Sequence, residues 1–423
     1  MKVEIPFGDG IETVDVSDEA IGGVISPNEL GDCDEGAALR AALSNPIGSD
    51  GLAEFLQGAS SALIIVNDAT RPTPTAKILD QICPELENLD VKFIVATGIH
   101  RAPTEEEYRL IFGERYDEIE SRVFSHDSKE SEMVLLDTTK RGTEIRVNKM
   151  VTEANRIVVI GSVEPHYFAG YTGGRKAFLP GVCAYETIEQ NHKHALAVEA
   201  QVLTLDGNPV HDDMEDAMAC LEKYSIFSIM VVLDRNRKIC SAYAGDIDST
   251  FNAAVQKADE IFVVNMSTKA DVVVAVTLYP QDVDLYQSQK ALDNAKYAVK
   301  DGGVIILVSA CRTGVGPPAF LKLLGSAETP EEVRVKIAEG YKLGYHKAAK
   351  IAEIELKMKM YAVTNLEPSI ATRAHLIPMR SVQEAVDTAL AEMGEGAKVT
   401  FIMDAVFTVP RVQSAYEQTK PIH

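Results

Sequence analysis

The chain has 423 residues, of which 46% are hydrophobic and 25% charged, and its formal net charge is −22 at pH 7. This length predicts two or three domains with a substantial core. The negative charge argues against nucleic-acid binding by bulk electrostatics, so an anionic ligand would need a local positive pocket. The six cysteines have no C-x-x-C spacing, and neither a signal-peptide pattern nor a membrane-spanning apolar run is present. We therefore expect a cytoplasmic protein with no nucleic-acid or membrane partner.

Three short apolar runs predict buried strands, and each run leads into a polar segment. The runs are Ser61–Val66, Val91–Thr97 and Ile157–Ser162. In an open α/β sheet such strands are parallel, and their carboxyl ends form the edge where ligands bind. We therefore expect the three polar segments to lie at one edge of one sheet.

The polar segment after the first run contains Asp68, Thr70 and Arg71. Thr70, with Thr73 or Thr75, is predicted to cap the next helix, whose N-terminus would attract an anion. Asp68 and Arg71 have two interpretations: they are ligand-binding groups, or they form a local ion pair within a capped turn.

The polar segment after the second run carries His100, ahead of a helix predicted at Thr104–Ile111 that begins with a capping box. A lone histidine is usually structural. This one shares the predicted sheet edge with the charged pair of the first segment, which favours a functional role. His126 lies in a polar loop and is interpreted as structural.

The third polar segment, Glu164–Val182, reads EPHYFAGYTGGRKAFLPGV and contains His166. Its glycines allow a ligand to approach the backbone closely. Lys176 beside such a turn is interpreted as a phosphate partner, a nucleophile or the attachment point of a cofactor. The alternative is that the stretch is only a turn, without a functional role. A P-loop is not supported, because Arg175 precedes the lysine and an alanine replaces the magnesium-binding hydroxyl. His192 follows in a second histidine cluster, as a candidate metal ligand.

The alternation of apolar runs and helical segments predicts two α/β domains with largely parallel sheets. Strands at Ser228–Leu233 and Ile261–Asn265 are expected to complete the first domain, and Ala270–Val276 is expected to open the second. The predicted domains are residues 1–265 and 266–423.

Two further helices carry candidate residues. Gln287 and Lys290 are three positions apart and therefore share a helix face, which is interpreted as ligand-binding or as solvated. A helix is also expected from about Asp212, with acidic residues that suit its dipole. His211 beside it is interpreted as part of this helix start rather than as a metal ligand.

Taken together, these motifs resemble the nickel-dependent lactate racemase family, which includes racemases and epimerases of other 2-hydroxy acids. Five motifs occur in family order over most of the chain, and this combination is more specific than any one of them. They are NDATRPTPT at Asn67–Thr75, GIHR at Gly98–Arg101, the stretch Glu164–Val182, Asn191–His192, and LYQSQKA at Leu285–Ala291.

The resemblance implies two α/β domains with the active site in the cleft between them. It also implies a nickel-pincer nucleotide, attached through a thioamide to Lys176, with His192 as a nickel ligand. His100 and His166 would be the paired acid/base groups. The remaining implied roles are substrate binding by Arg71, Gln287 and Lys290, and seating of the nucleotide by Asp68 and Thr70. Enzymes that make the cofactor would be partners.

The chemistry needs these residue types. The Cα–H of a 2-hydroxy acid is a very weak acid, so removal of a hydride, while a base takes the hydroxyl proton, is the easier route to a planar 2-keto acid. Racemisation then requires one acid/base group for each enantiomer, and imidazoles suit that role. Some family members use a tryptophan in the substrate pocket, whereas this chain has none. Tyr286 or His346 could line the pocket instead. The alternatives are a metal-dependent hydrolase that uses His192 and His194, and a non-catalytic nucleotide- or anion-binding protein.

Overall fold

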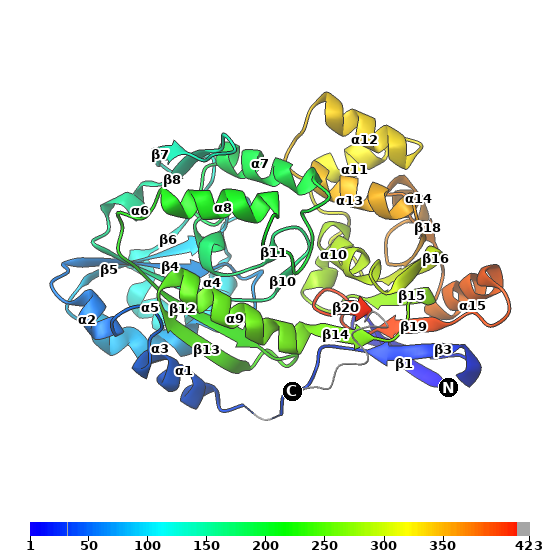
Figure 1. Cartoon of the computed structure of the whole chain (residues 1–423), viewed down its shortest axis with the longest axis horizontal. Coiled ribbons are helices and arrows are strands. Elements are labelled where there is room, and N and C mark those ends of the chain that lie inside the picture. Colours follow the sequence, from blue (N-terminus) through cyan, green and yellow to red (C-terminus); the bar gives the residue numbers. More distant parts are fainter. Residues whose placement is uncertain (32, 413–423) are drawn as a thin grey trace. The chain divides into compact units, whose positions relative to one another are not determined.

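The structure, a computed structural model, describes residues 1–31 and 33–412 and divides into two compact units (Figure 1). The large unit comprises Glu29–Ile261, and the small unit comprises Met1–Asn28 together with the chain from Phe262 onward. This division differs from the predicted domains at the N-terminus. The difference arises because β3 (Ile21–Ile25) pairs in parallel with β19 (Val399–Ile402) in the small unit.

The large unit is built on a six-stranded sheet with the order β13-β12-β9-β4-β5-β6. Neighbouring strands are parallel except β12 and β13, which are antiparallel. The three predicted strands are confirmed as the adjacent trio β9-β4-β5, so their carboxyl ends meet at one edge. The strands are β4 (Ser61–Asn67), β5 (Asp90–Ala96), β6 (Val123–Ser125), β9 (Arg156–Ser162), β12 (Ile226–Leu233) and β13 (Ile239–Gly245).

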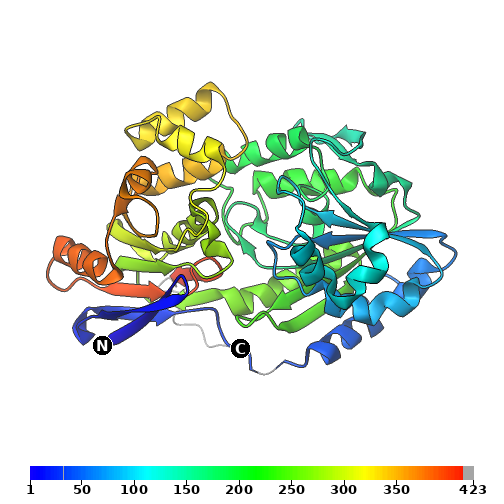
Figure 2. The same ribbon diagram turned by 180° about the vertical axis from the view of Figure 1, so that it is seen from behind.

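Alternate residues of these strands face opposite sides of the sheet. Ile64, Val66, Val158 and Ile160 belong to a core shared with the helices that follow one another early in the unit, and Figure 2 shows these helices in blue to cyan. They are α1 (Glu35–Ser44), α2 (Leu52–Leu56), α3 (Thr75–Leu86), α4 (Glu105–Phe112) and α5 (Tyr116–Ile119). The glycine-rich turn lies on the other side of the sheet, where the sulfur of Met230 accepts a hydrogen bond from Gly174 N at 3.3 Å.

The remaining elements of the large unit are short hairpins and four helices. The capping box predicted at Thr104 is confirmed at the start of α4. The predicted threonine cap of α3 is wrong, because the N-cap is Pro74 and no side chain caps this helix. The elements are β7 (Met133–Thr138), β8 (Glu144–Asn148), β10 (Pro165–His166), β11 (Gly170–Tyr171), α6 (Lys149–Glu153), α7 (Tyr185–Lys193), α8 (Pro209–Ala219) and α9 (Ile247–Phe262).

The small unit has a second six-stranded sheet, in the order β18-β17-β16-β15-β19-β3, with every neighbouring pair parallel. Both units are thus α/β with largely parallel sheets, as predicted. β14 (Val263–Met266) pairs with β20 (Val409–Val412) in the small unit, so the expectation that it completes the first domain is wrong. The other strands are β15 (Ala270–Val276), β16 (Val299–Val308), β17 (Lys359–Val363) and β18 (Ile377–Pro378).

One face of the second sheet is covered by the hairpin of β1 (Lys2–Phe7) and β2 (Gly10–Asp15) and by α15 (Val382–Met393), which share its core.

Among the described residues, no helix is both long and apolar enough to cross a membrane. The other helices of the unit are α10 (Leu285–Ala295), α11 (Pro318–Leu324), α12 (Pro330–Glu339), α13 (Tyr345–Glu355) and α14 (Pro368–Arg373).

Candidate active site

Hydrogen bonds join the segments that follow β4 and β9 at the carboxyl edge of the large sheet. Asn67 Nδ2 donates to Thr73 Oγ1 at 2.8 Å, and Thr73 Oγ1 donates to Ser162 Oγ at 2.9 Å. Arg71 Nη1 donates to Glu164 Oε1 at 3.2 Å. The arginine is thereby held against the glycine-rich segment, and the local ion pair considered for Asp68 and Arg71 is not the contact that forms.

Asp68 is instead the partner of His100. His100 Nδ1 lies 2.7 Å from Asp68 Oδ2, while Thr70 Oγ1 donates to Asp68 Oδ1 at 2.7 Å. Burial alone would raise the pKa of Asp68, but His100, the Thr70 hydroxyl and the nearby Arg71 together hold it below its ordinary value. The ionised carboxylate therefore accepts a hydrogen bond from Nδ1–H of His100, which fixes the ring and leaves Nε2 as the basic nitrogen.

This carboxylate makes a pH-dependent contribution to stability. Because the pKa of Asp68 is lowered in the folded state, its contribution is fully present above the ordinary carboxyl pKa and is lost as pH falls through the lowered value. At pH 7 we expect Asp68→Asn to reduce the free energy of unfolding by about 2 kcal/mol. The difference from the wild type should shrink toward acid pH, as measured by urea denaturation at several pH values.

Asp206→Asn serves as the control, because Asp206 is exposed in the turn before α8. It should change the free energy of unfolding little at any pH. A constant difference between Asp68→Asn and the wild type from pH 7 to pH 3 would contradict the assigned ionisation.

The glycine-rich segment folds back on itself so that His166 lies opposite Gly170 in the β10–β11 hairpin. Gly170 has φ +76°, and a Cβ there would collide with the carbonyl oxygen of Thr204. The hairpin therefore needs glycine for two reasons, the left-handed backbone and the close approach of another chain segment. His166 is buried, and the amide of Ala169 lies 3.4 Å from its Nδ1.

The collision at Gly170 predicts a large loss of stability for Gly170→Ala. We expect the free energy of unfolding to fall by at least about 3 kcal/mol, from backbone strain and the clash with Thr204 combined. Gly207→Ala is the matched control, since Gly207 has φ +74° and open space around its Cβ position. It should cost only about 1 kcal/mol. Equal losses in the two variants, measured by chemical denaturation, would show that the clash is relieved by a shift of the hairpin.

One aromatic ring, that of Phe168, gathers three of the predicted site residues. Its centroid lies 4.6 Å from the ring of His166 and 5.0 Å from the ring of His192. The Nζ atom of Lys176 lies 5.5 Å from the same centroid. All three polar side chains are buried, with 8% to 9% of their surface exposed. The structure therefore brings the predicted cofactor lysine, metal ligand and acid/base histidine together around a residue that the sequence did not single out.

His192, the candidate metal ligand, is a buried and neutral imidazole. Burial, with a smaller effect from the charge of Lys176, lowers the pKa of His192 to about 3, so the imidazole is neutral at pH 7. Its Nδ1 atom lies 3.2 Å from Asn191 Oδ1. A neutral imidazole held through one nitrogen is the form that binds nickel through the other. The donor chemistry of His192 and the buried amine of Lys176 thus fit the nickel-pincer nucleotide that the family resemblance implies.

The two neighbouring cations of the glycine-rich segment have different surroundings. Whereas Lys176 lies beside Phe168, Arg175 Nε lies 3.2 Å from Glu215 Oε1, and its guanidinium lies over Phe251 at 4.3 Å. Burial lowers the pKa of Arg175 to about 10. Arg175 therefore has a structural role, in which it anchors the turn to α8 and α9.

In the small unit, Gln287 and Lys290 share a face of α10, as predicted. Lys290 Nζ donates to Gln287 Oε1 at 2.9 Å and to Gln281 Oε1 at 3.4 Å. Tyr286 is buried, and its ring makes an edge contact with Phe320 at 5.5 Å. The sequence therefore placed this amide–amine pair correctly on one helix face. Its role in substrate binding, and the location of the site in a cleft between the domains, stay predictions.

Of the remaining histidines of the large unit, one is hydrogen-bonded to the backbone and two lie near carboxylates. His126 is buried, with Nε2 at 2.9 Å from the carbonyl oxygen of Cys183. His194 Nε2 lies 3.9 Å from Asp213 Oδ2, and His211 Nδ1 lies 3.6 Å from Glu215 Oε1. Within residues 1–31 and 33–412, no three His, Cys, Asp or Glu side chains are arranged to hold a metal by themselves.

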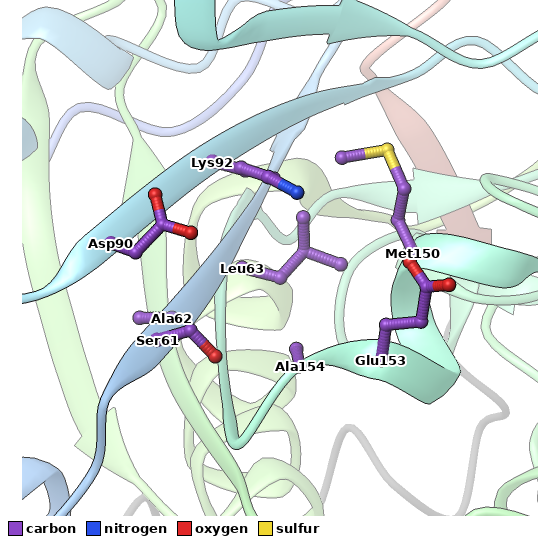
Figure 3. Close-up of a pocket in the computed structure, with 8 residues that line it drawn as sticks. All are labelled: Ser61, Ala62, Leu63, Asp90, Lys92, Met150, Glu153 and Ala154. Atoms are coloured by element: carbon purple, nitrogen blue, oxygen red, sulfur yellow. The ribbon is translucent and has the colours of Figure 1, made fainter.

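A pocket in the large unit lies at the amino ends of strands β4 and β5, away from their carboxyl ends (Figure 3). It includes the first residues of β4 and β5 and contains none of the predicted site residues, so it is separate from the candidate site. Its lining residues are Ser61, Ala62, Leu63, Asp90, Lys92, Met150, Glu153 and Ala154.

Sequence reasoning missed several residues that organise the site. Phe168 and Glu164 lie inside the glycine-rich segment, whose predicted function rested on its histidine, lysine and glycines. Asn208 was not singled out, although an asparagine directly before a proline is a signal for a helix N-cap. It caps α8, which therefore begins at Pro209 rather than near Asp212, and its Nδ2 donates to the carbonyl oxygen of Phe168 at 2.9 Å.

Fold and site together define a two-unit α/β protein with a buried lysine–histidine site at the carboxyl edge of a parallel sheet. Profiles of the lactate racemase N-terminal and C-terminal domains match residues 7–203 and 265–409. The lactate racemase of Thermoanaerobacterium thermosaccharolyticum is 32% identical over 97% of this chain and 99% of that protein. That of Lactiplantibacillus plantarum is 30% identical over 96% and 99%. The chain belongs to the lactate racemase family.

Solved structures agree with this assignment. The lactate racemase apoprotein from Thermoanaerobacterium thermosaccharolyticum has a TM-score of 0.90 and 32% identity, with 97% of this chain and 100% of that chain covered. A protein from Thermotoga maritima has a TM-score of 0.71 at 16% identity, with 90% and 99% covered, and it supports the fold alone.

Proposed function

We propose that the protein is a racemase or epimerase of a 2-hydroxy acid. In this proposal Lys176 carries a covalently attached nickel-pincer nucleotide, and His192 is a nickel ligand. The observation that carries the proposal is the arrangement of Lys176, His192 and His166 around Phe168, in a chain of the lactate racemase family.

When bound, the nickel-pincer nucleotide supplies a reversible acceptor for the hydride on the substrate Cα. The protein supplies the proton transfers. His100 donates from Nδ1 to Asp68, so its Nε2 can accept the hydroxyl proton of one enantiomer. His166 receives the Ala169 amide at Nδ1, so in the neutral ring the proton is on Nε2, from which it can donate a hydrogen bond to the substrate oxygen. Conversion of one enantiomer into the other then requires one imidazole to accept the hydroxyl proton and the other, in its protonated form, to donate one.

Substrate binding is assigned to Arg71, with Lys290 and Gln287. The guanidinium of Arg71 has five N–H donors, and the single bond to Glu164 orients it while leaving a bidentate grip on a carboxylate geometrically available. The contacts of Asp68 support a role as the partner of His100, with Thr70 fixing the carboxylate. Seating of the nucleotide by Asp68 and Thr70 stays a prediction.

One assay identifies the side chain of the substrate. The relatives are named lactate racemases, but this chain contains no tryptophan, a residue that some family members use in the pocket. The chain should be co-expressed with the cofactor-making enzymes and tested for racemisation over a panel of 2-hydroxy acids and sugar acids, lactate included. Intact mass should show an addition to the chain, and peptide mapping should place it at Lys176.

The alternatives predict different results. A metal-dependent hydrolase would turn over ester or amide substrates with plain zinc and would carry no added mass. A nucleotide-binding protein would bind its ligand without turnover. Added mass without racemisation of any panel member would leave the cofactor assignment standing and reject the substrate class.

A further inference from the structure

A buried network of hydrogen bonds adjoins His192, and the proposed reaction does not use it directly. Asn191 Nδ2 donates to Asp213 Oδ2 at 2.9 Å and to the carbonyl oxygen of Val210 at 3.3 Å. Both Asn191 and Asp213 have 0% of their surface exposed. Because both partners of Nδ2 are acceptors, only the NH₂ group of the amide can face them. The orientation of the Asn191 side chain is therefore determined by its partners.

This orientation has a consequence for His192. The other end of the amide, Oδ1, lies 3.2 Å from His192 Nδ1. A carbonyl oxygen cannot donate, so the contact is a hydrogen bond only when the proton of the neutral ring is on Nδ1. We infer that Asn191, locked by Asp213, is a positioning residue that holds His192 in the Nδ1–H tautomer and aims the lone pair of Nε2 at the metal.

Asp213 is itself fixed by hydroxyl groups. Thr139 Oγ1 donates to its Oδ1 at 2.5 Å, and Thr143 Oγ1 donates to its Oδ2 at 2.8 Å. The sequence predicted that the acidic residues at the start of helix α8 interact with its dipole. The carboxyl group of Asp213 is instead buried, and it links α7 to α8 through its hydrogen bond with Asn191. The N-cap of the same helix, Asn208, also holds the backbone of Phe168. Helix α8 thus supports both the metal ligand and the aromatic ring beside it.

The inference rests on the proposed function only for the identity of what Nε2 binds. The tautomer of His192 is a property of the protein without cofactor and can be measured there. An outer hydrogen bond to a ligating imidazole typically changes metal affinity by about 10- to 100-fold. The network therefore predicts one effect before loading and a second effect after it.

The test uses protein labelled with ¹⁵N-histidine and expressed without the cofactor-making enzymes. Long-range ¹H–¹⁵N spectra distinguish a protonated ring nitrogen from an unprotonated one, and His192→Gln identifies the signals of His192 by their loss. We expect a protonated Nδ1 and an unprotonated Nε2 in the wild type. In Asn191→Leu, which removes the amide at similar volume, we expect this tautomer to lose its dominance.

Thr187→Val is the matched control on the same helix. Thr187 is also 0% exposed, and its hydroxyl donates to the carbonyl oxygen of Glu144 at 2.6 Å and accepts from Arg146 N at 3.2 Å. The control therefore loses two buried hydrogen bonds without touching His192. It should lower thermal stability as Asn191→Leu does but leave the tautomer unchanged.

The second measurement is nickel retention after loading. Asn191→Leu should carry the same added mass as the wild type but lose nickel to a chelator about 10- to 100-fold more readily. An unprotonated Nδ1 in the wild type, or an unchanged Nδ1–H tautomer in a folded Asn191→Leu, would overturn the inference. A wild type that acquires neither added mass nor nickel would instead count against the proposed function, and the tautomer result would still decide the role of Asn191.

Discussion

Lys176→Arg is expected to abolish both the added mass of the cofactor and racemisation. The substitution keeps a cation beside Phe168, where Lys176 Nζ lies 5.5 Å from the ring centroid. A guanidinium, however, is a poor nucleophile and is protonated at all accessible pH values, so the linkage cannot form. Without the hydride acceptor, the rate should fall by at least about 10⁴-fold. Intact mass and an enantiomer-resolved assay on the co-expressed protein measure the two effects.

Lys193→Arg is the control for this change. Lys193 is exposed near the end of α7, adjacent to His192 in the sequence. It should keep the full added mass and the full rate. Attachment of the cofactor in Lys176→Arg, or its loss in Lys193→Arg, would place the linkage at another residue. Added mass in Lys176→Arg with undiminished racemisation would reject Lys176 as the anchor.

Single substitutions of the two proposed acid/base histidines are expected to lower racemisation by about 10²- to 10⁴-fold in both directions. Each full turnover needs one imidazole to accept a proton and the other to donate one, so loss of either blocks both directions. The half-reactions should differ. His100→Ala should still form the 2-keto acid from one enantiomer only, and His166→Ala from the other only, as detected by acid quench of stoichiometric enzyme.

Phe168 provides a check on indirect effects, because it contacts His166 without any group that transfers protons. Phe168→Leu should disturb the position of His166 and lower the rate, yet keto acid should still form from both enantiomers. A His100→Ala or His166→Ala enzyme with near-full rates in both directions would contradict the two-base scheme. Loss of both half-reactions in one variant would assign that histidine to cofactor binding instead.

The sequence predicted the fold where the signal was local. Buried parallel strands are continuous apolar runs, and β4, β5 and β9 were therefore found within one or two residues. The pairing of β3 with β19 could not be predicted, because β3 is short, contains two glycines and pairs with a strand from the far end of the chain. The placement of β14 failed for the same reason, since β14 pairs with β20 near the far end of the described chain.

The candidate site was predictable to a similar degree. Residues with unusual chemistry, such as Lys176 and His192, were named as candidates from their motifs, and the structure places both beside Phe168. Their supporting residues were not, because Asn191 and Asp213 are ordinary polar residues whose importance lies in burial and mutual contact. The contact between Asp68 and His100 was not predicted, because the two residues follow different strands. Contacts between side chains from different elements cannot be read from spacing along one element.

The pairing of β3 with β19 also affects the order in which the protein can be built on the ribosome. Residues 29–261 emerge as one uninterrupted segment and can complete their sheet during synthesis. β3 has already emerged by then, but its only strand neighbour, β19, is almost the last part of the described chain to be made. Strand β3 must therefore wait for its native partner while the large unit folds.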